Sequence, residues 1–546
     1  MYFYFTAFIT VICSIYYYCT RTFNIWNKKN VKGPKPIPFF GNFKDVFFRR
    51  KHVGVLYCEL YKQYPEEKVV GLYRMTSPTL LIRDLDIVKQ VLIKDFDSFP
   101  DRGVYYSKDR LGDNLFHSNV EVMKVLRKHL TSVFTANKFK NNFHILTGRA
   151  DKFVAYLENT TMKGAELDTL SAVRKYAVDS IMIAAFGMDV DPFNDDNNLC
   201  DVMDAAIQTP SYMLEMELLF PGTLSKLNLS LFSDRAVQFS REVVQAGINL
   251  DTVAKGEKNN TMDVLMGLRQ EGNISTARKT ENEKELWMKI TDNVLAGQVF
   301  IFYFAGYGNN SLLITYAMFY LAKYPDVQET LFREINEVLQ KHEGNFTYEA
   351  MKDMKFLHMV FEECLRMHPT TNSVSRNVAR DIKLDGTDIV VTKNTILAIS
   401  PYSIQHDEKY YPEPEKFKPE RFLPENVKER HPCAFLSFGQ GPRSCLGEST
   451  ILLYSLTFIF LKPYSSQLCL NVFLNYSENK FVIVVLKLFK FRYTIFIFFN
   501  LHLTYTFSSD SSTFLSAVFT NQLLIHLKIF SIFSVHQLII IYIHFY

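Results

Sequence analysis

The stretch Phe438–Gly447, FGQGPRSCLG, constrains this chain more than any other. It places one cysteine among three glycines and a proline, with Arg443 two residues before the sulfur. Glycine lets a backbone turn sharply and approach a flat partner closely. A neighbouring guanidinium favours the thiolate form of Cys445, which is the form that binds metals. A lone cysteine is usually a small buried side chain, but these surroundings predict a metal ligand.

The loop suits a thiolate axial ligand to haem, whose sulfur is tuned by backbone N–H groups. It resembles the haem-binding loop of the cytochrome P450 family, F-x-x-G-x-R-x-C-x-G. Every fixed position of that pattern matches: Phe438, Gly441, Arg443, Cys445 and Gly447. A structural loop around an idle cysteine would match all of them only by chance. The resemblance implies that Cys445 is the iron ligand and that the other four residues bind the cofactor, haem b (iron protoporphyrin IX).

Further segments agree with this resemblance in order and spacing. Glu363 and Arg366 form the family's E-x-x-R pair on one helix face, a pattern that any solvated helix also offers. Followed by Arg421 in the segment PERF, it implies a buried ion network with a structural role. The segments SFPDRGVYY (98–106) and FTANKFK (134–140) resemble microsomal members, particularly insect detoxifying enzymes and their vertebrate drug-metabolising relatives.

Three arginines correspond by position to the family's haem-propionate contacts, because guanidinium groups pair bidentately with carboxylates. They are Arg127, Arg376 and Arg443. Each of them alone is as readily a surface arginine. Met123 stands where the family has a tryptophan that donates to a propionate, and a thioether cannot donate a hydrogen bond.

Residues 299–322 form an apolar helical pattern interrupted at Ala305-Gly306 and resemble the helix that crosses the distal face of the haem. The resemblance implies oxygen activation at Ala305, Gly306 and Asn309. The family has an acid and an alcohol where this chain has Gly308 and Asn309, and neither replacement is a good proton relay. Three alternatives stay open: proton delivery through water or Ser311, rearrangement of a preformed peroxide, or a degraded or misread gene.

Residues 2–20 carry no charge and would span about 28 Å as a helix, close to the roughly 30 Å hydrocarbon core of a bilayer. Basic residues follow without an acid until Asp45, which favours the cytoplasmic side for this flank. A cleaved signal peptide would need charge before the apolar run and a small-residue site after it. The sequence therefore predicts a transmembrane anchor at 1–20 and a basic, proline-rich linker at 21–42.

The body, 43–448, is predicted as one large haem-binding domain, because no proline-, glycine- or serine-rich linker interrupts it. Alternation predicts a strand pair in 68–84 and a hairpin in 381–400 around Asp385-Gly386. Helical spacing occurs in 121–135 and 324–344. The resemblance implies a mainly α fold with a smaller β-rich lobe.

Residues 449–546 differ in composition from the rest of the chain. They contain no Gly, Met or Trp, one Ala, one Pro and fifteen Phe. One interpretation is membrane segments, since 529–546 are uncharged. The favoured interpretation is translated AT-rich noncoding sequence, which would leave the domain at 43–448 incomplete at its C-terminal end, without the family's last helix and pocket wall.

The resemblance implies a haem-thiolate monooxygenase at the endoplasmic reticulum membrane, facing the cytosol, that oxidises lipophilic small molecules with O2. Electrons would come from NADPH-cytochrome P450 reductase and from cytochrome b5, because the chain has no flavin or nicotinamide fingerprint. A candidate face for docking the electron-donating partner comprises Arg127, Lys128 and Lys138. The alternatives are an inactive truncated haem protein and a peroxide-rearranging haem-thiolate enzyme. The sequence shows no nucleic-acid-binding pattern, and its eight scattered cysteines form neither a disulfide framework nor a zinc motif.

Overall fold

The computed structural model describes residues 2–449 except 104–109, 163–167, 195–199, 201–203, 205–212, 214–215, 218, 221, 252–259 and 277–284. The predicted tail, 449–546, lies outside the described residues apart from Ser449. The described α-helices are α1 (Tyr2–Thr20), α2 (Ile25–Lys28), α3 (Lys44–Phe47), α4 (Val53–Gln63), α5 (Leu85–Lys89), α6 (Val120–Leu130), α7 (Ala136–Met162), α8 (Thr169–Phe186), α11 (Thr223–Lys226), α12 (Asp234–Asp251), α13 (Thr261–Glu271), α14 (Asp292–Lys323), α15 (Pro325–Lys341), α16 (Tyr348–Asp353), α17 (Lys355–Met367), α18 (Pro401–Gln405) and α19 (Pro424–Glu429).

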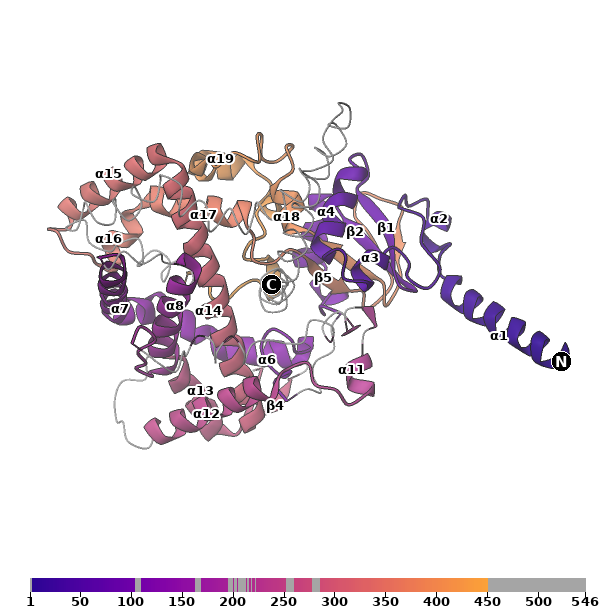
Figure 1. Cartoon of the computed structure of the whole chain (residues 1–546), viewed down its shortest axis with the longest axis horizontal. Helices are drawn as coiled ribbons and strands as arrows, with labels where there is room; N and C mark the ends of the chain where they lie inside the picture. The colour runs from indigo at the N-terminus through magenta and orange to yellow at the C-terminus, as the bar shows by residue number, and fades with distance from the viewer. Residues whose placement is uncertain are drawn as a thin grey trace, which may run out of the picture.

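Figure 1 separates a helical part around α14 from a β-rich lobe beside the N-terminus. The strands are β1 (Val69–Arg74), β2 (Ser77–Ile82), β3 (Asn273–Ser275), β4 (Trp287–Lys289), β5 (Val374–Asn377), β6 (Ile382–Lys383), β7 (Val390–Val391) and β8 (Ile396–Ile399). The expected mainly α fold with a smaller β-rich lobe is therefore confirmed.

The main sheet has the order β1-β2-β8-β5 and joins distant parts of the chain. The β1–β2 pair is antiparallel, which confirms the strand pair expected in 68–84. β8 lies parallel to β2 and antiparallel to β5. The hairpin around Asp385-Gly386 is confirmed by the pairing of β6 with β7. The strands β1, β2 and β8 are almost wholly buried because helices and loops cover the sheet.

Helix α14 crosses the helical part and packs against α8, α12 and α17. The side chain of Thr291 caps its N-terminus by accepting a hydrogen bond from the N–H of Val294. The apolar pattern was expected to be interrupted at Ala305-Gly306, but the helix continues through both residues. Gly306 instead allows close packing, since a Cβ there would lie 2.6 Å from the Ile181 Cδ1 on α8.

The segment expected as a linker, 21–42, packs against the β-rich lobe. The indole of Trp26 is buried, and its Nε1 donates a hydrogen bond to the Leu72 carbonyl at 2.8 Å. Gly33 lies directly against the backbone of Gly71. The first half of the segment that follows α1 is therefore held by contacts to β1.

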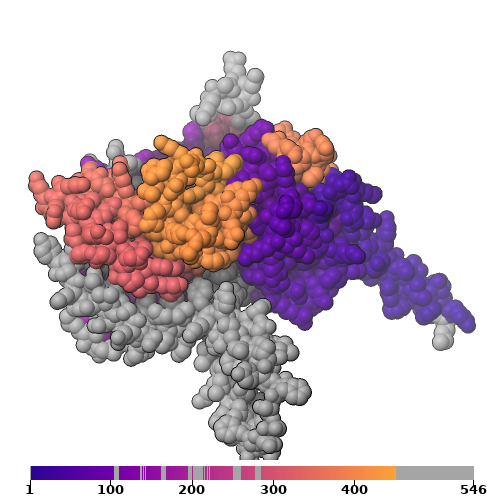
Figure 2. Space-filling model, turned by 90° about the horizontal axis from the view of Figure 1, so that it is seen from above, coloured from indigo at the N-terminus to yellow at the C-terminus, as the bar shows by residue number. Residues whose placement is uncertain are grey.

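Among the described residues, α1 alone combines the length and hydropathy needed to cross a membrane. It projects away from the β-rich lobe in Figure 1. In Figure 2 the orange surface of the last described residues lies between the indigo N-terminal lobe and the salmon-coloured α15 region. The segment that carries the cysteine loop thus connects the two parts of the fold.

Candidate active site

The cysteine loop is closed by its own backbone. The N–H of Cys445 donates to the Phe438 carbonyl at 2.8 Å, and that of Ser444 donates to the Gly441 carbonyl at 2.9 Å. Gly441 has φ +74°, and a Cβ there would lie 1.9 Å from the Leu92 carbonyl oxygen. Only glycine fits this position. Gly441 thus packs behind the loop against Leu92 and does not line the cavity described next.

A cavity of about 390 Å³ lies between the cysteine loop and α14. Phe438, Cys445 and Gly447 line it from the loop, and the predicted residues of α14 line it from the helix: Ala305, Gly306 and Asn309. The structure thus brings together residues that are far apart in the sequence.

The sulfur of Cys445 is exposed to this cavity, while protein encloses it on the other sides. Burial raises the pKa of its thiol to about 11; the N–H of Gly447 opposes this rise, Glu448 adds to it, and Arg127 opposes it. The sequence predicted that Arg443 would favour the thiolate. In the structure Arg443 turns away, and its Nε donates to the Pro100 carbonyl at 2.7 Å. Arg127 is the main cation that acts on the sulfur.

The three predicted arginines all reach the cavity. Arg127, on α6, donates from Nη1 to the Ser444 carbonyl at 2.8 Å and thereby ties α6 to the cysteine loop. Arg376, on β5, is buried and donates from Nη1 to the carbonyl of Ser375 at 2.9 Å. Arg443 forms an ion pair with Asp101 at 3.3 Å.

The described lining of the cavity carries cations but no carboxylate; the cations are Arg74, Arg102, Arg127, Lys138, Arg376 and Arg443. Burial and then repulsion by Arg443 lower the pKa of Arg376 to about 9. Within the described chain, Nε of Arg376 and Nη1 of Arg443 are buried without a hydrogen-bond partner. Although Asp101 pairs with Arg443, these two buried donors need an acceptor, so this part of the cavity suits an anionic group.

Arg74 and Arg102 were missed as site residues. Arg102 lies in the segment 98–106, which had been noted only for its resemblance to microsomal proteins, and its guanidinium stacks on Phe116 at 3.8 Å. Arg74 ends a strand that the alternation predicted, but nothing local marks it as a cavity residue. Met123 is buried in the cavity wall.

The polar side chains of α14 decide which of its groups could deliver a proton in the cavity. The hydroxyl of Ser311 donates to the Tyr307 carbonyl within α14 at 2.6 Å, and Ser311 does not line the cavity. Asn309 and Asn310 do line it. Asn310 is buried, and its Oδ1 accepts no hydrogen bond from the described residues. The polar groups of α14 that face the cavity are therefore amides.

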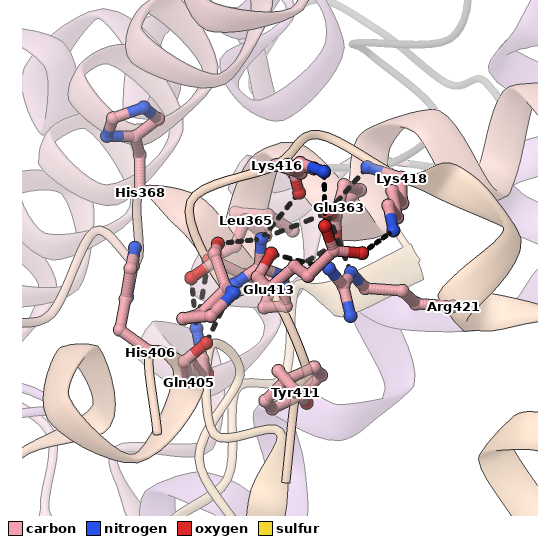
Figure 3. A network of polar contacts seen from close by, with 12 residues as sticks. Glu363, Leu365, His368, Gln405, His406, Tyr411, Glu413, Lys416, Lys418 and Arg421 are labelled. Atoms are coloured by element: carbon pink, nitrogen blue, oxygen red, sulfur yellow. Dashed lines mark hydrogen bonds and ion pairs between the residues drawn. The ribbon is translucent and has the colours of Figure 1, made fainter. Parts of the chain in front are cut away.

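The E-x-x-R pair forms the expected buried network behind the cysteine loop (Figure 3). Nε of Arg366 lies 2.7 Å from Oε2 of Glu363, and both side chains are fully buried. Nε of Arg421, in the 3-10 helix Pro419–Phe422, lies 3.4 Å from Oε1 of Glu363. Arg366 also donates to the carbonyls of Gln405 and Pro414, both at 2.8 Å. The network thereby holds α17 against the segment that leads to Cys445.

Comparison with known proteins agrees with this geometry. The family model for cytochrome P450 matches residues 31–450. The chain belongs to the cytochrome P450 family. It is 43% identical over 446 residues to cytochrome P450 6B6 of Helicoverpa armigera, a match that covers 82% of this chain and 88% of that protein. It is 42% identical over 445 residues to cytochrome P450 6B1 of Papilio polyxenes, covering 81% and 89%.

This P450 is accordingly a haem-thiolate monooxygenase, and the residues present fit the cofactor of the family. Cys445 lines the cavity and would supply the sulfur ligand to haem, and the donors Arg376 Nε and Arg443 Nη1, which no described residue accepts from, would suit the propionate carboxylates. Haem with a thiolate ligand supplies O2 activation when bound. With haem bound, this chain's own residues would orient the sulfur, neutralise the propionates and enclose the substrate.

Proposed function

We propose that this P450 oxidises a lipophilic small molecule with O2 and electrons from NADPH-cytochrome P450 reductase, with cytochrome b5 as a second donor. The cofactor is haem b, held by the iron ligand Cys445. The catalytic face is Ala305, Gly306 and Asn309, and the cofactor-binding residues are Arg127, Arg376, Phe438, Arg443 and Gly447. Gly441, expected as a further cofactor-binding residue, instead shapes the loop that carries Cys445.

One observation carries this proposal: Cys445 faces α14 across a cavity lined also by Arg376 and Arg443, which each have a buried donor, Nε and Nη1, with no hydrogen-bond partner among the described residues. The remaining walls are largely apolar, for example at Ile181, Ile301 and Phe304. Apolar walls with few polar groups are typical of sites for lipophilic ligands.

The test uses the full chain, purified with haem and combined with the reductase. We expect a thiolate-type Soret band in the reduced, CO-treated sample and oxidation of an apolar probe that requires both NADPH and O2. Cys445→Ser should lose the thiolate-type band and the oxidation. An imidazole-type band in the wild-type chain would refute the ligand assignment, and a thiolate band without NADPH-dependent turnover would favour an inactive haem protein.

A second candidate function is rearrangement of an organic peroxide, in which the substrate supplies both oxygen atoms and no external electrons are needed. The amide of Asn309 at the cavity favours it, because it replaces the alcohol of the family's proton relay. Turnover of a lipid hydroperoxide without reductase would support this function. Strict dependence on NADPH would exclude it.

We propose that α1 anchors the protein in the endoplasmic reticulum membrane with the catalytic domain in the cytosol. The exposed side chains of Ile37, Phe39 and Phe48 on the adjoining lobe support contact with the membrane surface. Microsomes should retain the chain in alkaline carbonate, and protease added outside sealed vesicles should digest the catalytic domain. Release by carbonate, or protection from protease, would contradict the proposal.

The three basic residues proposed as the reductase-docking face do not lie on one exposed surface. Arg127 and Lys138 line the cavity, whereas Lys128 is exposed on α6. Lys128→Glu should therefore raise the KM for reductase more than Lys138→Glu does, because only an exposed charge meets the partner.

A further inference from the structure

The segment Arg110–Ser118 forms a wall at one end of the cavity. Leu115, Phe116 and His117 line the cavity from this segment. Phe116 lies under the guanidinium of Arg102, and the ring of His117 contacts Phe232, with centroids 5.5 Å apart. These three side chains are presented by irregular backbone, so their positions depend on whatever holds that backbone in place.

Asn114 holds the inside of the segment. It is fully buried, and its Nδ2 donates to the carbonyl of Leu111 at 2.7 Å. Its Oδ1 accepts from the backbone N–H groups of Phe116 and His117, both at 2.9 Å. Nδ2 also lies 2.9 Å from Nδ1 of His117. One amide side chain thus sets the backbone of two wall residues and the ring orientation of one.

Gln298 ties this segment to α14. It is fully buried, and its Oε1 accepts from the N–H of Leu115 at 3.0 Å. Its Nε2 donates to the carbonyl of Asp113 at 2.9 Å. The segment also packs tightly on Gly297, where an added Cβ would lie 3.1 Å from the Leu111 carbonyl oxygen. A helix residue outside the cavity lining therefore fixes the wall from behind.

The other end of the wall is joined to the proposed cofactor site. Nη2 of Arg443 donates to the carbonyl of Ser118 at 3.1 Å. Burial, and to a lesser extent Arg102, lowers the pKa of His117 to about 3. The imidazole is therefore neutral across the physiological range and presents an uncharged face to the cavity.

We propose that Gln298 and Asn114 are positioning residues that set substrate selectivity by holding Leu115, Phe116 and His117 as a rigid wall. The inference rests on the proposed function in one respect, that the ligand is a lipophilic molecule bound in this cavity. A rigid wall discriminates by ligand size because a ligand gains its contacts without first ordering the side chains it touches. Loosening the wall should lower the affinity for bulky ligands and leave the affinity for small ligands unchanged.

The test compares two iron-binding probes on the haem-loaded full chain: imidazole, which is small, and clotrimazole, whose three rings extend into the cavity. Gln298→Met removes the two hydrogen bonds to the wall segment, together with a third to the Val294 carbonyl within α14, and keeps the length of the side chain. We expect clotrimazole affinity to fall about tenfold with imidazole affinity unchanged, since ordering each side chain on binding costs about 0.5–1.5 kcal/mol. Amide exchange at Leu115 should also become faster.

Gln90→Met is the matched control. Gln90 is buried, its Oε1 accepts from the N–H of Asp385 at 2.8 Å, and its Nε2 donates to the Lys383 carbonyl at 3.1 Å, but none of its hydrogen-bond partners belongs to the wall. This variant should leave the ratio of the two affinities unchanged.

Gly297→Ala is an independent variant, because it displaces the segment without removing a hydrogen bond. It should change the clotrimazole-to-imidazole ratio in the same direction as Gln298→Met. Unchanged ratios in both variants, with wild-type imidazole binding, would overturn the proposal. Failure of the wild-type chain to bind imidazole at its iron would instead refute the proposed haem site, so the two failures are distinguishable.

Discussion

Replacing Arg366 by methionine should prevent this chain from forming a stable haem protein. Arg366 and Glu363 are both fully buried, with their charged atoms 2.7 Å apart. Removing the guanidinium leaves the buried carboxylate with Arg421, 3.4 Å away, as its remaining cation, and breaking a buried ion pair costs about 3–5 kcal/mol. The carbonyls of Gln405 and Pro414 lose their donor as well, at about 1–3 kcal/mol each. The lowest values of these three costs add up to about 5 kcal/mol, which equals the free energy of unfolding of a domain of low stability.

The assay is the yield of the reduced, CO-treated thiolate band together with the midpoint of urea unfolding. Glu363→Gln/Arg366→Met should recover part of the loss, because the carboxylate charge that lost its closest cation is gone and the two carbonyls still lack donors. Arg333→Met is the matched control: its partner Glu329 lies 3.9 Å away on exposed α15, and such pairs contribute at most about 0.5 kcal/mol. A single variant as stable as wild type, or a double variant no better than the single one, would refute the reasoning.

Three further outcomes are expected. Gly441→Ala places a Cβ 1.9 Å from the Leu92 carbonyl oxygen at φ +74°, so the yield of the thiolate band should fall. Gly148→Ala, with open space around it, should leave the band unchanged. Equal thiolate bands in the two variants would contradict the packing argument. Burial raises the pKa of Asp179 to about 6 despite Arg149 at 3.1 Å. The folded pKa lies above the unfolded value of about 3.9. The wild-type chain therefore loses folding stability as the pH rises from about 4 through 6, because the carboxyl must ionise in a buried site. Asp179→Asn does not ionise, so its stability relative to wild type should increase by about 3 kcal/mol across this range. Urea unfolding should show the gain growing by about 2 kcal/mol from pH 4.5 to pH 7.5, and an equal gain at both pH values would contradict this prediction. Sequencing the mature messenger across codons 440–460 should reveal a splice that replaces 449–546; a message encoding the tail as written would refute its noncoding origin.

Short-range features of this chain were predictable from the sequence because neighbouring residues specify them. The glycines and the arginine around Cys445 lie within ten residues of it, and the backbone bonds that close the loop join residues of the same stretch. The strand pair β1–β2 is joined by a short turn, so alternation and turn residues suffice to predict it. The E-x-x-R pair is likewise a contact within one helix turn.

The side-chain directions at the site could not be predicted, because contacts between distant segments decide them. Arg443 was expected to act on the sulfur, but carbonyls of Pro100 and Ser118, more than three hundred residues earlier, draw its guanidinium away. Arg127 takes that place because α6 packs beside the loop.

The role of Gln298 could not be predicted for the same reason. No sequence pattern around it indicates a function, yet its side chain hydrogen-bonds to the backbone of Asp113 and Leu115. The composition of the Cys445 loop therefore specified the thiol ligand and its turn. Which cations surround the sulfur, and which segment forms the cavity wall, depended on burial. A buried donor or acceptor must find a partner, and only the folded chain determines which residues are within reach.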